Sequence, residues 1–209
     1  MKRDYESEVA FYRDEINNPQ WINSRVMNDG ILDYPQWMNH YEGASVLEIG
    51  CGPCSSLYYG MKHNKITTTC VDALADVYRE VLGGKMFHPI IQGVGEDIDT
   101  IVHNSFDIVF MQNSLDHMSE PLIVIEKCLK LLNLNGLLHI CGFVNEGIKN
   151  NYEGLHQHNF FLLNDELMYT NKQAQPPINI RMKFNLDVID VGACGVRSQD
   201  WFYITFRCI

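Results

Sequence analysis

Short apolar runs alternate along the chain with longer segments that place apolar residues at helical spacing. Each short run is followed by glycine or a polar residue, which is typical of a buried strand. Strands that alternate with helices form βαβ units, and such units build a parallel sheet. The expected strands are residues 45–49, 66–71, 88–92, 106–111 and 137–141.

Helices are predicted in two of the segments between these strands. Residues 73–82 have a helical pattern that a pair of glycines terminates. Residues 119–132 place their leucines and Ile125 on one face, and Ser119 is the expected N-cap of this helix. Residues 133–136 then predict a turn before the fifth strand.

The two ends of the chain differ from this central pattern. Residues 4–16 predict a helix, and the aromatic-rich segment 19–42 predicts a second short helix and a loop. We expect residues 1–42 to form a helical cap over the mouth of the active site and residues 43–209 to form a single α/β core. The C-terminal segment holds two further apolar runs.

Composition and charge exclude several classes of protein. The chain has 209 residues, 46% of them hydrophobic, so it can bury one full core. Its net charge of −10 and its lack of a lysine–arginine cluster argue against nucleic acid or a membrane surface as partner. The charged N-terminus lacks the apolar segment of a signal peptide, and no apolar run approaches the ~18 residues of a membrane helix. With an odd number of cysteines, seven, we expect reduced thiols and a cytoplasmic protein.

Residues suited to ligand binding follow the strands, where open parallel sheets bind their ligands. Glu48 lies where a cationic group of a ligand could be held, and Gly50 and Gly52 let the backbone approach that ligand closely. Asp72 ends the second strand and suits a ribose diol, because a carboxylate accepts two hydrogen bonds at once. Polar residues also follow the third and fourth strands, at 93–97 and 112–117.

The order of these motifs resembles that of class I S-adenosylmethionine-dependent methyltransferases, and of their type 11 group in particular. The resemblance implies a Rossmann-like α/β fold with a seven-stranded, mostly parallel sheet and helices on both faces. It also implies that residues 178–208 supply the last two strands, one of them antiparallel. The matching motifs are VLEIGCGP (46–53), VDA (71–73), GVGEDI (93–98), SFDIVFMQNSLDH (105–117) and LLNLNGLLHI (131–140).

The resemblance implies S-adenosylmethionine as the cofactor and assigns residues to its parts. The methionine end lies at Glu48, the ribose at Asp72 and the adenine at Gly95. The chain departs from the family pattern at Cys54, which replaces a glycine, and at Val94, which replaces an aspartate. The implied cofactor-binding residues are Glu48, Gly50, Cys51, Gly52, Asp72, Ala73, Gly95, Glu96, Asp97, Gln112 and Asn113.

A finer resemblance is to the subgroup found in bacterial surface-polysaccharide gene clusters. It rests on the stretches 113–117, 145–147 and 152–157. It implies O-methylation of a small polar acceptor such as a sugar, a nucleotide-sugar or a surface-polysaccharide precursor, with a natural product as second choice. The residues expected to face this substrate are Asp116, Asn145, Glu146 and Tyr152.

Two histidines are candidates for the catalytic role. A hydroxyl acceptor loses a proton when it is methylated, and histidine is a suitable base near neutral pH. We therefore expect His117 or His156 to be that base. His156 and His158, with Glu153 nearby, could also suggest a metal site. Two alternating histidines are not a specific zinc spacing, so we expect a polar loop near the substrate and no metal.

Three other functions are compatible with parts of the sequence. The Cys-Gly-Pro-Cys sequence at 51–54 matches a thioredoxin-type redox motif, but the preceding Glu48 and the lack of a tryptophan before Cys51 argue against it. An NAD-dependent oxidoreductase would need glycine at position 55, which is Ser55. A non-catalytic protein that binds S-adenosylmethionine for regulation, or as the partner of another methyltransferase, is a further alternative. The sequence leaves the oligomeric state and any metal dependence open, and a homodimer is compatible with it.

Overall fold

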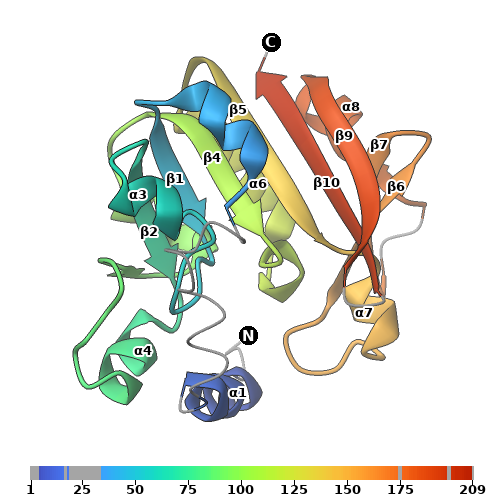
Figure 1. Ribbon diagram of the computed structural model, residues 1–209. Coiled ribbons are helices and arrows are strands. Elements are labelled where there is room, and N and C mark those ends of the chain that lie inside the picture. Colours follow the sequence, from blue (N-terminus) through green and yellow to red (C-terminus); the bar gives the residue numbers. More distant parts are fainter. Residues whose placement is uncertain (1–4, 17, 19–33, 174–175, 197–198, 209) are drawn as a thin grey trace.

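A seven-stranded sheet forms the centre of the molecule (Figure 1). The computed structural model describes residues 5–16, 18, 34–173, 176–196 and 199–208. The strands of the large sheet are β1 (Ser45–Ile49), β2 (Thr67–Asp72), β3 (Ile91–Gln92), β4 (Phe106–Gln112), β5 (Leu132–Phe143), β9 (Leu186–Val196) and β10 (Gln199–Cys208).

The strand order of this sheet is β3-β2-β1-β4-β5-β10-β9. Strands β3, β2, β1, β4 and β5 are parallel neighbours, whereas β10 runs antiparallel to both β5 and β9. The predicted α/β class, with a mostly parallel sheet and one antiparallel strand near the C-terminus, is confirmed. The order reverses between β1 and β4, and ligands of open parallel sheets bind at such a point.

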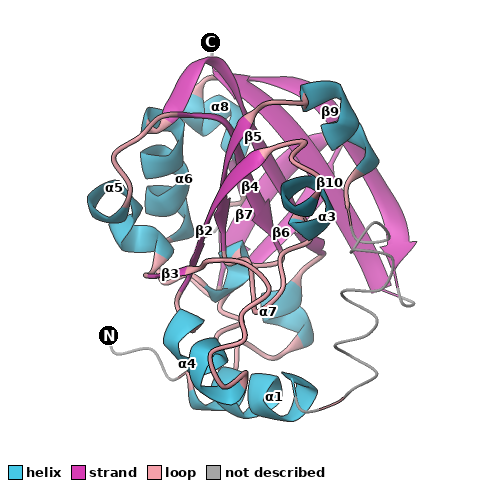
Figure 2. Cartoon of the chain, turned by 60° about the vertical axis from the view of Figure 1, so that its left-hand side comes forward, coloured by secondary structure: helices cyan, strands magenta, loops and turns pink. Residues whose placement is uncertain are grey.

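Helices and a second, smaller sheet surround the large sheet (Figure 2). The sequence did not predict the small sheet, whose order is β6-β7-β8. Its strands are β6 (His158–Leu163), β7 (Glu166–Asn171) and β8 (Ile178–Asn179). The helices are α1 (Glu6–Ile16), η2 (Gln36–Tyr41), α3 (Tyr58–Lys62), α4 (Ala75–Val81), η3 (Gly95–Asp97), α5 (Ile98–Ile101), η4 (Leu115–His117), α6 (Pro121–Lys130), α7 (Glu146–Lys149) and α8 (Ile180–Phe184), with η denoting a 3-10 helix.

Alternating side chains of the strands build a hydrophobic core on each face of the large sheet. Leu47 and Val109 point to the face covered by α5, α6, α8 and the small sheet. Val46 and Phe110 point to the other face, where α3 and the segment around Met38 of η2 cover them. Successive side chains of a strand alternate between faces, so the continuous apolar runs of the sequence reflect burial on both sides.

Helix α1 lies below the carboxyl ends of β1 and β4 in Figure 1 and packs beside α4. Ile16 and the partly buried Val9 and Tyr12 pack with Tyr78 of α4 in a third apolar cluster. By contrast, the short helix η2 packs on a face of the sheet, where Trp37 lies against His139. Residues 19–33 of the predicted cap lie outside the described residues, and the division into cap and core stays a prediction.

Two local predictions were wrong, and the first concerns the start of α6. Ser119 does not cap this helix, because it begins at Pro121 and Glu120 occupies the N-cap position. Instead, the Glu96 carboxylate accepts hydrogen bonds from the backbone N–H groups of Ser119 and Glu120, at 2.6 and 3.2 Å. Proline at the first helical position needs no such partner, since it has no N–H.

The second is the predicted turn at 133–136, which is instead an irregularity within β5. Pairing with β4 joins Phe106 to Leu132 and then Ile108 to Leu137, so extra residues of β5 bulge out between these pairs. Asn135 adopts a left-handed conformation with φ of 62°. The asparagine–glycine pattern therefore marked a real change of direction, but the strand continues through it.

Candidate active site

Two cavities meet at the carboxyl ends of β1, β2 and β4. Their volumes are about 310 and 120 Å³, and Tyr12, Gly50 and Asn113 line both. Of the predicted site residues, Gly50, Asp72, Ala73, Gly95, Asn113, His117 and His156 line the larger cavity. Glu48, Gly50, Cys51, Gly52, Gln112 and Asn113 line the smaller one.

Gly50 is required by the backbone of the loop that follows β1. Its φ of +73° is left-handed, and a Cβ at this position would lie 2.4 Å from the Cβ of Ser114. The Ser114 hydroxyl in turn donates a 3.0 Å hydrogen bond to the Ile49 carbonyl. The ends of β1 and β4 thus approach so closely that only glycine fits, which leaves backbone exposed to the cavity.

Asp72 joins the glycine loop to β2. Its Oδ2 accepts a hydrogen bond from the Gly52 N–H and its Oδ1 accepts one from the Leu74 N–H, both at 2.8 Å. Burial raises the pKa of Asp72, while hydrogen bonds from Leu74, Gly52 and Tyr78 oppose the shift. A carboxylate has about four lone-pair positions, so Asp72 can still accept a hydrogen bond from a ribose in the cavity.

Glu48 lines the smaller cavity although it is only 2% exposed. Its Oε2 accepts hydrogen bonds from the Ser55 hydroxyl and from the Cys70 thiol. Burial raises the pKa of Glu48 to about 8, and those two hydrogen bonds act in the opposite direction. Glu48 is therefore largely protonated at neutral pH until a cationic partner reaches it.

Asn113, which follows β4, is hydrogen-bonded to the end of β5. Its φ is +48°, its N–H donates to the Cys141 carbonyl at 2.8 Å, and its Oδ1 accepts from the Phe143 N–H at 3.2 Å.

The Cys-Gly-Pro-Cys segment lines the smaller cavity, with both Cys51 and Cys54 buried. Burial raises the pKa of Cys51, which is opposite to the low thiol pKa of a reactive redox motif.

Some predicted residues do not line either cavity. Glu96 is hydrogen-bonded to the start of α6, and Asp97 is exposed. Asn145 has a buried Oδ1 without a hydrogen-bond partner, and the Tyr152 hydroxyl accepts a 3.0 Å hydrogen bond from Asn159 Nδ2. Their binding roles stay predictions.

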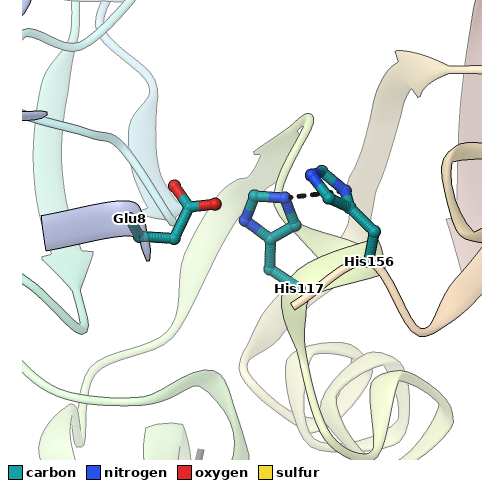
Figure 3. Close-up of side chains that lie close together, drawn as sticks. All are labelled: Glu8, His117 and His156. Carbon is teal, nitrogen blue, oxygen red and sulfur yellow. Dashed lines mark hydrogen bonds between the residues drawn. The ribbon is translucent and has the colours of Figure 1, made fainter. Parts of the chain in front are cut away.

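His117 and His156 face each other at one side of the larger cavity (Figure 3). His117 Nε2 lies 3.2 Å from His156 Nδ1, and Asp116 Oδ2 lies 2.7 Å from His156 Nδ1 and 3.3 Å from His117 Nε2. Glu146 Oε2 is 3.8 Å from His156 Nδ1, and Figure 3 shows Glu8 opposite His117. The hydrogen bond with Asp116 raises the pKa of His156.

The sequence did not reveal which face of the first helix matters. Tyr5, Glu8, Phe11 and Tyr12 of the N-terminal segment line the larger cavity. The recurrence of Tyr5, Tyr12 and their apolar neighbours predicted a helix. This spacing of apolar residues could not distinguish a helix face that packs on the core from a helix face that contacts a ligand.

Comparison with known proteins agrees with this geometry. Residues 47–140 match the family model described as a methyltransferase domain. This match supports a methyltransferase that uses S-adenosylmethionine. The comparison with curated proteins found no match. The methyltransferase match ends within β5, so α1, α7, the small sheet and the last two strands lie outside it.

Solved structures share the fold of the methyltransferase domain at low sequence identity. An O-methyltransferase family protein from Burkholderia thailandensis has a TM-score of 0.60 and 14% identity, covering 100% of this chain. This chain spans 64% of that protein's length. The N-methyltransferase NodS from Bradyrhizobium japonicum WM9, in complex with S-adenosylhomocysteine, has a TM-score of 0.57, 12% identity and 97% coverage of both chains. A SAM-dependent methyltransferase from Aquifex aeolicus has a TM-score of 0.55, 16% identity and 100% coverage of both.

Proposed function

We propose that this protein transfers the methyl group of S-adenosylmethionine to a hydroxyl oxygen of a small polar acceptor, such as a sugar or a surface-polysaccharide precursor. The placement of His117 and His156 in the wall of the cofactor cavity carries this proposal. An alcohol is a weak nucleophile until its proton leaves, and the two histidines with Asp116 are suitably placed polar groups to promote that loss.

Each of the two cavities binds a different part of the cofactor. The methionine end occupies the smaller cavity, where the Glu48 carboxylate faces its ammonium group. The adenosine occupies the larger cavity, with its ribose hydroxyls on Asp72 and its adenine beside Gly95. The sulfonium then lies near Gly50 and Asn113, which line both cavities, so an acceptor beside His117 can approach the methyl group.

The methyl transfer itself needs alignment more than activation, because a sulfonium is already a good leaving group. Holding the acceptor oxygen in line with the methyl carbon accelerates the displacement by proximity and orientation. Helix α1 forms one wall of the larger cavity through Glu8 and Tyr12 and limits access of water to it.

The charge of the chain bears on the size and type of the acceptor. A net charge of −10 does not attract polyanions such as nucleic acids. In the part of the chain that the structure describes, every helix is too short or too polar to span a bilayer. Small polar molecules that diffuse freely to the cavity are the substrates that suit this surface.

The test is a transfer assay with the full chain, S-adenosylmethionine and a panel of free hexoses, nucleotide-sugars and the corresponding amino sugars. Release of S-adenosylhomocysteine reports turnover, and mass spectrometry of the product locates the methyl group. We expect an O-methylated product, and we expect His117→Gln or His156→Gln to lower the maximal rate about 100-fold. His103→Gln, at an exposed histidine that does not line the cavity, should have no effect.

Three outcomes contradict parts of the proposal. An N-methylated amino sugar as the sole product would exclude the hydroxyl acceptor. Unchanged maximal rates in both histidine variants at saturating donor would remove the catalytic role of His117 and His156. Binding of S-adenosylhomocysteine without turnover on any member of the panel would favour the non-catalytic alternative.

A further inference from the structure

The polar atoms of Asp116, His117 and His156 converge on one point. The three pairwise distances among Asp116 Oδ2, His117 Nε2 and His156 Nδ1 are 2.7, 3.2 and 3.3 Å. Asp116 and His117 are neighbours in η4, whereas His156 comes from the loop before β6, 40 residues further along the chain than Asp116. Local chain geometry therefore does not explain why the three atoms meet.

No placement of protons on the two imidazole nitrogens makes all three pairwise contacts favourable. If both imidazole nitrogens carry a proton, both N–H groups can donate to Asp116 Oδ2, but the two donors then lie side by side with their nitrogens 3.2 Å apart. If only one of them does, the other nitrogen and Asp116 Oδ2 are two acceptors that face each other, at 3.3 Å for His117 or 2.7 Å for His156. Each state therefore leaves one close donor–donor or acceptor–acceptor contact beside the hydrogen bonds with Asp116.

A metal ion removes this conflict. Nitrogen and oxygen ligands lie about 2.0–2.2 Å from an ion such as Zn²⁺, so neighbouring ligand atoms are roughly 3.0–3.5 Å apart. The distances in this group are in that range or slightly outside it. Both imidazoles would then present a lone pair to the ion, and the carboxylate would supply negative charge.

Two further carboxylates lie close to members of this group. The ligand atoms of Asp116, Glu146 and His156 lie within 4.8 Å of one another, and so do those of Glu8, His117 and His156. Among the described residues, the basic side chain paired with this group is Lys149, whose Nζ lies 4.0 Å from Glu146 Oε1. Three carboxylates therefore gather with one lysine and two imidazoles, so the group is negatively charged, and suited to a divalent cation, when the imidazoles are neutral.

We propose that His117 Nε2, His156 Nδ1 and Asp116 Oδ2 bind a divalent transition-metal ion in the wall of the cofactor cavity, with Glu146 and Glu8 as additional ligands. Two imidazoles with carboxylates suit Zn²⁺, Fe²⁺ or Mn²⁺, whereas Mg²⁺ prefers oxygen ligands alone. The side chains of Glu8, His117 and His156 line the cavity, so the ion has an open position toward the acceptor. The proposal replaces the expectation from the sequence that this region binds no metal, since that expectation considered His158 and Glu153 as partners of His156.

This site refines the role of the two histidines in the proposed function. An acceptor hydroxyl bound to the ion has a lowered pKa and releases its proton to solvent. Its oxygen then forms a bond to the methyl carbon while the C–S bond breaks, and the electron pair of that bond stays on sulfur. The catalytic role of the ion rests on the proposed function, but the binding of the ion does not.

The test measures metal binding directly. The full chain, treated with EDTA and dialysed, is titrated with Zn²⁺ by calorimetry and with Mn²⁺ by electron paramagnetic resonance. We expect one ion per chain, binding at least about tenfold weaker in His156→Gln and in Asp116→Asn, and no comparable binding of Mg²⁺. His103→Gln is the matched control and should bind the ion as the wild type does.

Folding and cofactor binding are followed in parallel by thermal unfolding and by titration with S-adenosylhomocysteine. Should Asp116→Asn fail to fold because its side chain is buried, His117→Gln, whose side chain is 24% exposed, replaces it. Failure of the wild type to bind either ion, or equal binding by the folded variants, overturns the metal site. In that case normal S-adenosylhomocysteine binding leaves the methyltransferase proposal standing, whereas its absence contradicts the proposed function separately.

Discussion

The cofactor side and the histidine side of the cavity are built in different ways. The cofactor side consists of residues at the ends of adjacent strands, and its key contacts involve backbone groups, as at Gly50 and Gly52. The histidine side joins side chains from α1, η4, α7 and the loop before β6, and Asp116 and His156 are 40 residues apart.

This difference explains what each side can be used for. The cofactor side depends on strand geometry that the methyltransferase match at 47–140 includes, and under the proposed function it serves a donor common to many enzymes. Glu8, Glu146 and His156 lie outside that match. Under the proposed function, these three residues can change with the acceptor while the donor site stays the same.

The largest effect should come from Gly50→Ala. A methyl group at φ +73° and 2.4 Å from Ser114 forces the ends of β1 and β4 apart. We expect a loss of at least about 2 kcal/mol in stability and no measurable binding of S-adenosylhomocysteine. Chemical denaturation and calorimetry measure the two quantities.

Gly84→Ala is the matched control for Gly50→Ala. Gly84 has a similar φ of +79°, but nothing lies within 4 Å of the position that a Cβ would take. This variant should lose about 1 kcal/mol of stability and keep its ligand affinity. Equal effects of the two substitutions on affinity would show that the close contact with Ser114 is unimportant.

The next largest effect should come from Asp72→Ala. The substitution removes acceptors for the ribose hydroxyls and also the hydrogen bond that holds the Gly52 N–H. We expect the affinity for S-adenosylhomocysteine, measured by calorimetry, to fall about 100-fold. Asp76→Ala, at an exposed residue on α4, should leave it unchanged, and a normal affinity in Asp72→Ala would exclude the ribose role.

A substitution on the histidine side should separate donor binding from turnover. In Gly147→Ala the added Cβ would lie 2.9 Å from Asn159 Oδ1 and 3.0 Å from the His158 carbonyl, so α7 and Glu146 must shift. We expect turnover with the acceptor found in the panel to fall about tenfold, while the affinity for S-adenosylhomocysteine changes less than about threefold. Ile148→Ala, at an exposed neighbour on α7, is the control, and a parallel loss of donor affinity would contradict the separation of the two sides.

The smallest effect concerns pH. Because the pKa of Glu48 is raised to about 8, the folded protein holds a proton that the unfolded chain loses near the ordinary pKa of 4.5. Folding stability from this group is therefore present below about pH 4.5 and declines as the pH rises through about 8. The cofactor's ammonium group favours the ionised carboxylate, so binding should release a proton, and affinity should rise about fivefold between pH 7 and 8 as the free carboxyl group ionises.

Calorimetry of S-adenosylhomocysteine binding in two buffers of different ionisation enthalpy measures this proton release. Glu48→Gln, which stays neutral, should abolish the release and should be less sensitive to pH in thermal unfolding. Proton release of the same size in Glu48→Gln would assign it to another group.

Much of the large sheet could be predicted because its strands are buried on both faces. β1, β2 and β4 gave short apolar runs that end where a polar residue faces the cavity, so both the strand and its ligand-binding residue were visible. The small sheet was not visible: β6 buries His158, Asn159 and Phe160 in succession, and its later residues become gradually more exposed, without regular alternation. Its polar residues are satisfied by contacts across the sheet, such as His158 with the Tyr169 hydroxyl at 2.9 Å.

The sequence by itself determined the fold class and the residues at the strand ends, because hydrophobic periodicity and the glycine–aspartate pattern are local properties of the chain. The cofactor followed from the resemblance of these motifs to those of class I methyltransferases. It also singled out His117 and His156 as candidates. Only the tertiary structure decided that they meet each other, Asp116 and Glu8 in one wall of the cavity. Such a meeting depends on how α1 and the segment before β6 pack against the end of β4, and no local pattern records a contact between segments so far apart.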